Sequence, residues 1–347
     1  MSEMTFAEFC DYVKENIEER LGEFTIVRGP DIKVVDKNNG VKCTGLLMAD
    51  SVTDNIAPNI YLEYYYSRYK DGVSMDSVLN EIADEFRSVR ANMIENLDAL
   101  KSELWQHDLA YIFPKLVNYE RNKEMLEDVP YVPFQDLAVT FRMLVNKDES
   151  GVSSTIVKQD KLEEFGKSVD EMYEIALENY NRMFPAKVMR LEDLLARAMG
   201  MPGMGGEFET QAYVVTNDIC VNGATSILDK KTLEALHEEM GGDFYILPSS
   251  LHECIAVPVG MGEESLLPEL VREVNRDVLA ETDFLSDTVY RYYGETRELS
   301  MINPPEWMRE KDSPEMEEPG IDGPEMAGPE MGSPEPEQSL SNRKMSM

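Results

Sequence analysis

Two serines, a histidine and a distant carboxylate in the C-terminal half have the side-chain types used in acyl transfer. Ser249 and Ser250 stand in a tight connection between two expected strands, and His252 follows two residues later. A serine hydroxyl becomes a nucleophile when a base takes its proton, and an acid must orient that base. Glu253 cannot orient its own neighbour, because adjacent strand residues point to opposite faces. A hydrolase or transferase site of Ser250 and His252 therefore requires a carboxylate from another strand, such as Asp287.

The signatures that would identify a catalytic or metal centre are absent from the sequence. The nucleophile-elbow pattern G-x-S-x-G is missing, since Leu247 and Pro248 precede Ser249. The zinc pattern H-E-x-x-H is incomplete at His237, and no EF-hand spacing occurs. We predict no metal site and no cofactor. The sequence leaves enzymatic activity open and favours a non-catalytic protein.

The charge balance excludes whole classes of partner. The chain of 347 residues carries 67 Asp and Glu against 33 Lys and Arg, a net charge of −34. A nucleic-acid backbone or an anionic lipid surface requires clustered positive charge, so direct binding to either is not expected. Four cysteines without a C-x-x-C pair indicate free buried thiols. With no leader-like N-terminus and no long apolar run, the sequence predicts a cytoplasmic protein without membrane contact.

The elements that must position these side chains alternate between helices and strands. Thr5 and Glu8 form a capping box at the start of an amphipathic helix, and Asn39-Gly40 predicts a tight hairpin turn. On a later helix, capped by Ser168, Asn179 is expected to satisfy backbone groups. Strands are expected in this half at 24–27, 32–35, 41–48, 111–117, 137–145 and 153–157.

After a stretch rich in Gly and Met, the pattern becomes a ββα rhythm. Strands are expected at 212–216, 224–228, 244–247, 251–259, 288–293 and 296–301. Between them lie a helix at 230–240 and a second one with Leu267, Val271, Val274 and Val278 on one face. The sequence thus predicts an α+β fold of mostly antiparallel sheets with packed amphipathic helices, in two αβ halves.

Composition divides the chain into four expected regions. These are an N-terminal α+β region (1–198), a Gly/Met-rich linker (199–210), a C-terminal ββα-type region (211–302) and a disordered acidic Pro/Glu/Met tail (303–347). The tail carries only 11 acidic and 4 basic side chains. Most of the negative charge therefore belongs to the region expected to fold.

Several strings of the sequence carry a resemblance to a known family. They are Asn38-Asn39-Gly40-Val41 with Gly45-Leu46, Ala57-Pro58-Asn59-Ile60-Tyr61-Leu62, Asn118-Tyr119-Glu120-Arg121-Asn122, Val129-Pro130-Tyr131-Val132-Pro133, Asp136-Leu137-Ala138-Val139, Leu247-Pro248-Ser249-Ser250-Leu251-His252-Glu253 and Ser286-Asp287-Thr288-Val289-Tyr290. From about residue 4 to about residue 301 the chain resembles domain-of-unknown-function family 5688, an uncharacterised bacterial family of Firmicutes. A second likeness, to the uncharacterised YtpQ-like family, runs from Asp136 to Asn179 and into the ββα rhythm. Both resemblances imply a cytoplasmic α+β protein, and neither implies an activity, a cofactor or catalytic residues.

Three functions remain open at this point. The favoured one is a non-catalytic acidic protein-interaction module whose partner is a basic or other cytoplasmic protein. Tyr64 and Tyr292, if exposed, would anchor that interface. The alternatives are a hydrolase or transferase using Ser250, His252 and Asp287, and a nucleic-acid-mimicking inhibitor of a basic protein.

Overall fold

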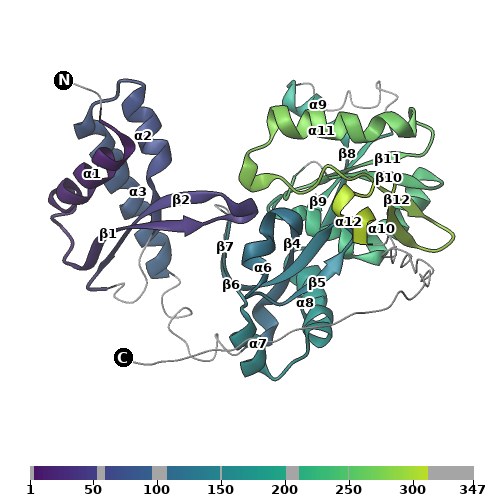
Figure 1. The fold of residues 1–347 in the computed structure, drawn as a ribbon, viewed down its shortest axis with the longest axis horizontal. Coiled ribbons are helices and arrows are strands. Elements are labelled where there is room, and N and C mark those ends of the chain that lie inside the picture. Colours follow the sequence, from purple (N-terminus) through teal and green to yellow (C-terminus); the bar gives the residue numbers. More distant parts are fainter. Residues whose placement is uncertain are drawn as a thin grey trace, which may run out of the picture.

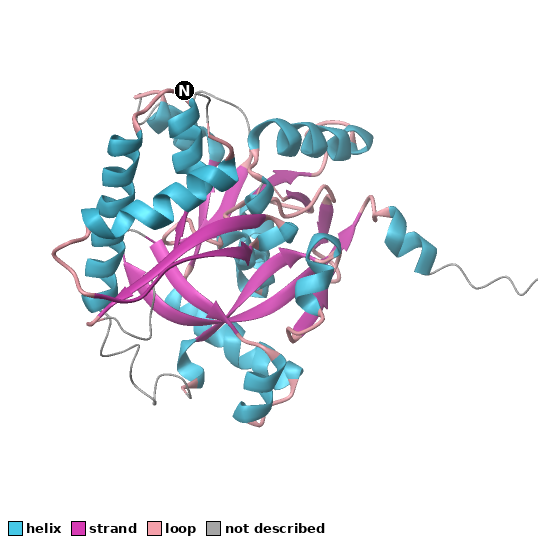
Figure 2. Cartoon of the chain, turned by 60° about the vertical axis from the view of Figure 1, so that its left-hand side comes forward, coloured by secondary structure: helices cyan, strands magenta, loops and turns pink. Residues whose placement is uncertain are grey.

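The computed structural model describes residues 4–52, 59–95, 108–148, 151–200, 211–248 and 250–311. An N-terminal lobe of helices lies at one end, and a two-stranded ribbon reaches from it to a larger body (Figure 1). Every strand pair of these residues is antiparallel. The predicted α+β class is therefore confirmed, and Figure 2 shows helices lying around the strands.

The N-terminal lobe has a hydrophobic core of its own. Its elements are α1 (Phe6–Arg20), β1 (Ile26–Asp36), β2 (Lys42–Asp50), β3 (Asn59–Tyr61), α2 (Leu62–Lys70) and α3 (Met75–Glu95). The capping box predicted at Thr5 and Glu8 is present, and the apolar stripe of α1 packs on α3 and the sheet. Burial of this stripe holds the short sheet, because three strands alone bury little apolar surface.

The body begins with a sheet built around one long strand. Its elements are β4 (Ile112–Asn118), α6 (Lys123–Leu126), β5 (Tyr131–Phe134), β6 (Leu137–Asp148), β7 (Gly151–Ile156), α7 (Gln159–Phe165) and α8 (Val169–Met183). Strand β6 pairs with β4 along one edge and with β5 and then β7 along the other. As predicted, Asn179 on α8 satisfies backbone carbonyls, donating to Leu109 at 2.7 Å and Ile112 at 2.9 Å.

A second, six-stranded sheet completes the body in the order β13-β12-β10-β11-β9-β8. Its elements are β8 (Ala186–Arg190), α9 (Leu191–Ala198), β9 (Tyr213–Asn217), α10 (Lys230–Met240), β10 (Phe244–Leu247), β11 (Cys254–Pro258), α11 (Leu267–Val278), β12 (Tyr290–Tyr293), β13 (Glu298–Met301) and α12 (Glu306–Lys311). Leu116, Leu137 and Val139 of the first sheet belong to the same core as this one. The body is thus held together by apolar contact between its two sheets.

The domain division expected from the sequence differs from the cores that the structure shows. Strand β8 precedes the expected linker, yet it pairs with β9 and forms an edge of the C-terminal sheet. The lobe (α1 to α3) and the body are the units that bury separate cores. Residues 201–210 of the expected linker and the tail after Lys311 lie outside the described residues.

Two local expectations are corrected. Residues 224–228 were expected as a strand but lie in a 3₁₀ helix, η5 (Gly223–Leu228), in which every residue is buried. A short, wholly buried run of small and apolar residues has no clear alternation that distinguishes strand from helix. On α11, Val274 and Val278 are 41% and 75% exposed, because Val271 and Asn275 face the body instead.

All four cysteines are free, although they are not uniformly buried. Cys10 and Cys254 are buried, whereas Cys220 is exposed. Desolvation raises the pKa of the Cys10 thiol to about 11 and that of Cys254 further. These two thiols therefore pack as small apolar side chains.

The tip of the β1–β2 hairpin docks the lobe onto the body. Asn39 (φ 61°) and Gly40 (φ 69°) adopt the two positive φ values predicted for this turn. The Asn39 amide nitrogen donates to the carbonyl oxygens of Glu281 at 2.7 Å and Phe284 at 2.8 Å. Its amide oxygen accepts from Asn122 Nδ2 at 2.9 Å. One side chain therefore joins the hairpin to two separate segments of the body.

Replacing Asn39 with alanine is expected to lower the free energy of unfolding by about 2–4 kcal/mol. The variant loses three side-chain hydrogen bonds, and alanine tolerates the left-handed backbone at this position less well than asparagine does. Asn39→Gly is the matched variant, because it loses the same bonds and keeps the backbone freedom, so its loss is expected to be smaller. Urea unfolding followed by circular dichroism measures both. Equal stability of Asn39→Ala and the parent chain would show that the hairpin tip does not hold the lobe.

Candidate functional site

A cavity of about 480 Å³ lies where the hairpin, the first sheet and the turn before β11 meet. Its lining is mixed, with basic, acidic, amide and apolar side chains from the hairpin, the first sheet and the C-terminal half of the chain. They are Val35, Asp36, Lys37, Asn38, Lys115, Val117, Met125, Thr140, Arg142, Ile156, Val221, Asn222, Leu251, His252, Thr282 and Asp283. Lys37, Lys115 and Arg142 outnumber the two carboxylates, so a strongly acidic protein surrounds a cationic cavity.

The strand register of the first sheet explains why two basic residues share one wall. Lys115 on β4 is paired with Thr140 on β6, and Arg142 stands two residues further along β6. Since side chains alternate across a strand, Lys115, Thr140 and Arg142 point to the same face. The residues between them, among them Leu116 and Phe141, point to the opposite face and enter the cores.

The ammonium group of Lys115 lies in a poorly hydrated environment. The side chain is half-buried, and no hydrogen bond or ion pair of its Nζ occurs with any residue that the structure describes. Burial, with the nearby charges of Arg142 and Lys37, lowers the pKa of Lys115 from 10.5 to about 8, against an opposing effect of Asp283. A buried charge without a partner destabilises the fold unless a ligand neutralises it.

Arg142 is oriented by the neighbouring strand. Its Nε donates to Ser154 Oγ at 3.2 Å and its Nη2 donates to the Ser154 carbonyl oxygen at 3.0 Å. These bonds hold one edge of the guanidinium group on β7, and burial lowers the pKa of Arg142 below its ordinary range. Further N–H donors of this guanidinium group point away from these bonds and can bind an anion. Their planar fork geometry suits a carboxylate or a phosphate.

The other walls add a histidine–carboxylate pair and a third cation. His252 Nδ1 accepts from the backbone N–H of Asn222 at 3.3 Å, and its Nε2 lies 3.7 Å from Asp283 Oδ1. On the hairpin, Lys37 Nζ lies 3.7 Å above the centre of the Tyr61 ring. The cation–π contact holds this ammonium group at the lobe side of the cavity.

The serine–histidine–carboxylate arrangement considered from the sequence is not assembled as expected. Ser250 is buried, and its Oγ accepts from the backbone N–H of His252 at 2.9 Å, closing a turn. The carboxylate facing His252 belongs to Asp283, and His252 Nδ1 is occupied by Asn222. Ser249 lies outside the described residues.

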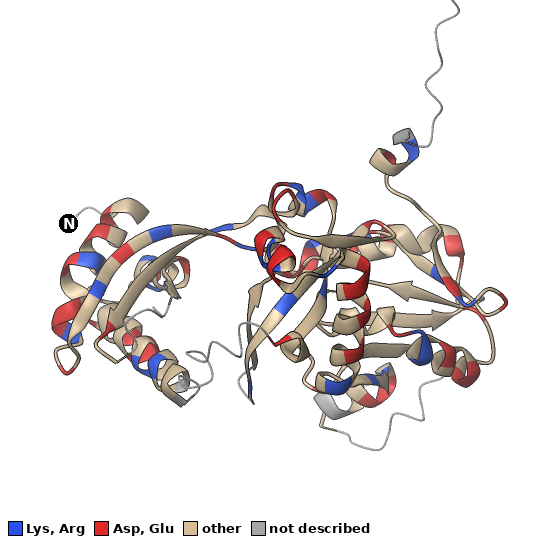
Figure 3. Cartoon of the chain, turned by 90° about the horizontal axis from the view of Figure 1, so that it is seen from below, with Lys and Arg blue, Asp and Glu red and all other residues tan. Residues whose placement is uncertain are grey.

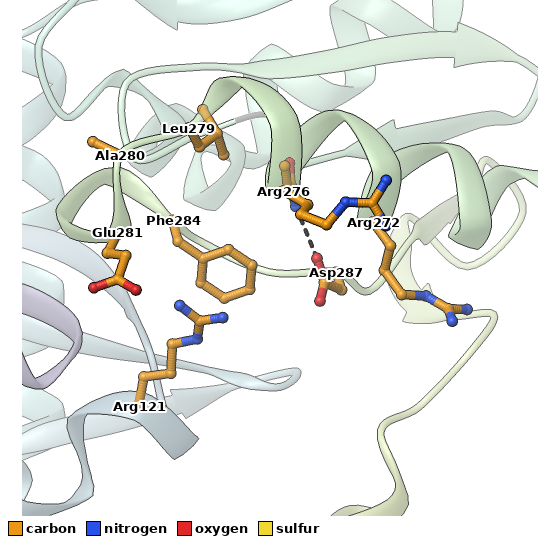
Figure 4. Close-up of a pocket in the computed structure, with 9 residues that line it drawn as sticks. Arg121, Arg272, Arg276, Leu279, Ala280, Glu281, Phe284 and Asp287 are labelled. Atoms are coloured by element: carbon orange, nitrogen blue, oxygen red, sulfur yellow. Dashed lines mark hydrogen bonds between the residues drawn. The ribbon is translucent and has the colours of Figure 1, made fainter.

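Asp287 lines a different, smaller pocket of about 250 Å³. Figure 4 shows its carboxylate beside α11, where it accepts from Asn275 Nδ2 at 3.0 Å. Arg121 reaches the same pocket and stacks over the Phe284 ring at 3.7 Å. The fold therefore brings Asp287 to α11 and Asp283, four residues earlier, to His252, which the sequence spacing could not show.

The two tyrosines considered as interface anchors have opposite environments. Tyr64 on α2 is 64% exposed, whereas Tyr292 on β12 is 1% exposed. Tyr292 stacks on Phe244 with ring centroids 4.9 Å apart, because its place in the strand alternation points it into the core. Tyr292 is therefore unable to anchor a partner.

Among the described residues, two other kinds of site are absent, a metal centre and a membrane-spanning helix. In the described ranges, no three His, Cys, Asp or Glu side chains come together in a way that could hold a metal ion. No helix within those ranges is both long and apolar enough to cross a bilayer. Figure 3 shows Lys and Arg on strands in the middle of the molecule, while many Asp and Glu lie on helices and loops.

Sequence reasoning missed the two residues that dominate the cavity. Lys115 and Arg142 each have apolar residues on both sides in their strands, Ile112–Asn118 and Leu137–Asp148. A charge inside such a run has to be paired, exposed or functional, since burying it alone is costly. This signal was present in the sequence, but only the pairing of β4 with β6 brings the two charges together.

The comparisons with known proteins give a family and nothing more specific. A family model described as a family of unknown function (DUF5688) matches residues 6–293. No curated protein and no solved structure matches the chain.

Proposed function

The chain belongs to the family of unknown function DUF5688, and from its own cavity we propose that it binds a small organic anion between Lys115 and Arg142. One observation carries the proposal. An ammonium group and a guanidinium group share one wall of a cavity, and neither has an ion pair among the described residues. Two such charges are expensive to desolvate, and a bound carboxylate or phosphate offsets that cost with charge-assisted hydrogen bonds.

The size and lining of the cavity support a small organic ligand. Its volume of about 480 Å³ falls in the range of small-molecule sites, roughly 300–1,000 Å³. Val117, Ile156 and Leu251 supply apolar surface beside the charged groups. Such a lining suits a ligand with an anionic group and a short organic body.

Calorimetric titration tests this function with phosphate, succinate and pyruvate at pH 7 and constant ionic strength. Saturable binding of at least one anion is expected, weakened about tenfold or more in Arg142→Met, which loses a charge-assisted hydrogen bond. Lys231→Met is the matched control, because it removes one positive charge from an exposed position on α10. Absence of saturable binding, or equal weakening in both variants, would contradict the proposal.

A protein-interaction module remains the second candidate, supported by the exposure of Tyr64. In that proposal, a basic or other cytoplasmic protein would contact α2 of the acidic lobe, and Tyr64→Ala would abolish its recovery in affinity purification. A nucleic-acid mimic receives less support, because Figure 3 shows basic residues among the acidic ones. A cytoplasmic location remains part of the proposal, and the buried free thiols of Cys10 and Cys254 support it.

A further inference from the structure

We infer that Lys115 forms a covalent imine with a small oxo acid bound in the cavity. The inference rests on the proposed anion-binding function and adds the ligand class and the reacting atom. Lys115 Nζ has no hydrogen bond or ion pair among the described residues, so no neighbour holds it away from an electrophile. Its backbone lies within a strand paired through seven successive residues with β6, which fixes where the side chain begins.

The neighbouring charge selects an oxo acid from among carbonyl compounds. Lys115 and Arg142 are diagonal neighbours on one sheet face, a pair typically about 7–8 Å apart with the Cβ atoms somewhat closer. In a 2-oxo acid the carbonyl carbon is bonded directly to the carboxylate. A carboxylate held by Arg142 therefore places the carbonyl carbon toward Lys115, which raises the effective concentration of the two reacting groups.

The protonation state of Lys115 supports a nucleophilic role. With a pKa near 8, a substantial fraction of the amine is neutral at physiological pH, whereas an ordinary lysine is almost wholly charged. Burial is the largest cause, and the adjacent Arg142 and Lys37 act in the same direction. Desolvation beside another cation is a known way to activate a lysine toward carbonyl groups.

The step balances without an oxidant or a reductant. Neutral Nζ attacks the carbonyl carbon, a C–N bond forms, and the carbonyl π electrons move to oxygen, which takes up a proton. The resulting carbinolamine loses its hydroxyl group as water, leaving a protonated imine on Lys115. In total one proton is consumed and one water leaves. His252 and Asp283 line the same cavity, with His252 Nε2 3.7 Å from Asp283 Oδ1. In this inference the pair exchanges protons with the reacting oxygen and nitrogen atoms.

Reductive trapping tests this inference on the full chain. The protein is incubated with pyruvate, 2-oxobutyrate or 2-oxoglutarate, reduced with borohydride, digested and examined by peptide mass spectrometry. We expect at least one oxo acid to modify the Lys115 peptide preferentially, at least about tenfold above the Lys231 peptide. Lactate, which has the carboxylate but no keto group, is expected to compete with the oxo acid. Arg142→Gln is expected to reduce trapping although Lys115 itself is unchanged in this variant.

The pH dependence separates a site reaction from unspecific labelling. Trapping at Lys115 is expected to rise through about pH 8, whereas an exposed lysine reacts increasingly up to a pKa of about 10.4. Anion binding without a Lys115 adduct would overturn this inference and leave the proposed function intact. Labelling spread equally over surface lysines would overturn it as well. If neither anion binding nor a Lys115 adduct were observed, the proposed function would be overturned together with this inference.

Discussion

Lys115→Met is expected to be more stable than the parent chain at pH 7, by about 1–3 kcal/mol, while losing anion binding. A tenfold change in an ionisation constant corresponds to about 1.4 kcal/mol, and the pKa of Lys115 falls from 10.5 to about 8 on folding. Holding this ammonium group in the cavity therefore costs stability whenever it is charged. Methionine has a similar length without the charge, so it removes the cost and packs against the apolar lining.

The sign of the pH dependence follows from the lowered pKa. Below about pH 8 lysine 115 is protonated in both the folded and unfolded chain, so the full cost is present. Between about pH 8 and pH 10.5 the unfolded chain holds the proton and the folded chain does not, so the stability contributed by this site rises with pH. The advantage of Lys115→Met should therefore be largest below pH 8 and shrink toward pH 10.

Urea unfolding of both proteins at pH 7 and pH 9.5 measures this difference. Lys231→Met serves as control, because its exposed ammonium group is expected to change stability little at either pH. A Lys115→Met variant that is less stable at pH 7, or whose advantage is independent of pH, would show that the ammonium group is not destabilising in the folded chain.

Asp136→Ala is expected to destabilise the chain by about 3–5 kcal/mol. The carboxylate is 4% exposed and accepts three hydroxyl hydrogen bonds, from Ser286 Oγ at 2.5 Å, Thr288 Oγ1 at 2.9 Å and Tyr290 OH at 2.6 Å. Alanine leaves all three buried donors without their acceptor, and each unsatisfied buried group costs about 1–3 kcal/mol. The bonds join the β5–β6 turn to the segment entering β12, so their loss weakens contact between the two sheets.

Two variants show whether the carboxylate itself is responsible. Asp136→Asn keeps the size and one acceptor oxygen, so its loss is expected to be smaller than that of alanine. Thr288→Val removes a single donor and should cost about 1 kcal/mol. The midpoint of urea unfolding compares the three. If Asp136→Ala unfolded at the parent's midpoint, the hydroxyl cluster would not contribute to the contact between the sheets.

The local elements could largely be predicted from the sequence, because their signals are local. The capping box at Thr5 and the positive-φ turn at Asn39 each depend on residues a few positions apart. The prediction of a strand at 224–228 was wrong, because a short, fully buried run lacks the alternation that distinguishes strand from helix. The single apolar face expected for α11 is only partly buried, with Val274 and Val278 exposed, because packing decides which side of an amphipathic helix meets the body.

By itself, the sequence determined the α+β class, the strongly acidic charge and the absence of a recognised catalytic signature. Tertiary structure alone decided which distant residues meet. Asn39 bonds Asn122, the hydroxyls around Tyr290 bond Asp136, and Lys115 comes to lie beside Arg142. Composition and periodicity describe how each segment buries its own apolar face. A cationic cavity depends instead on strand register and on the docking of the hairpin, which are set by contacts between segments far apart in the chain.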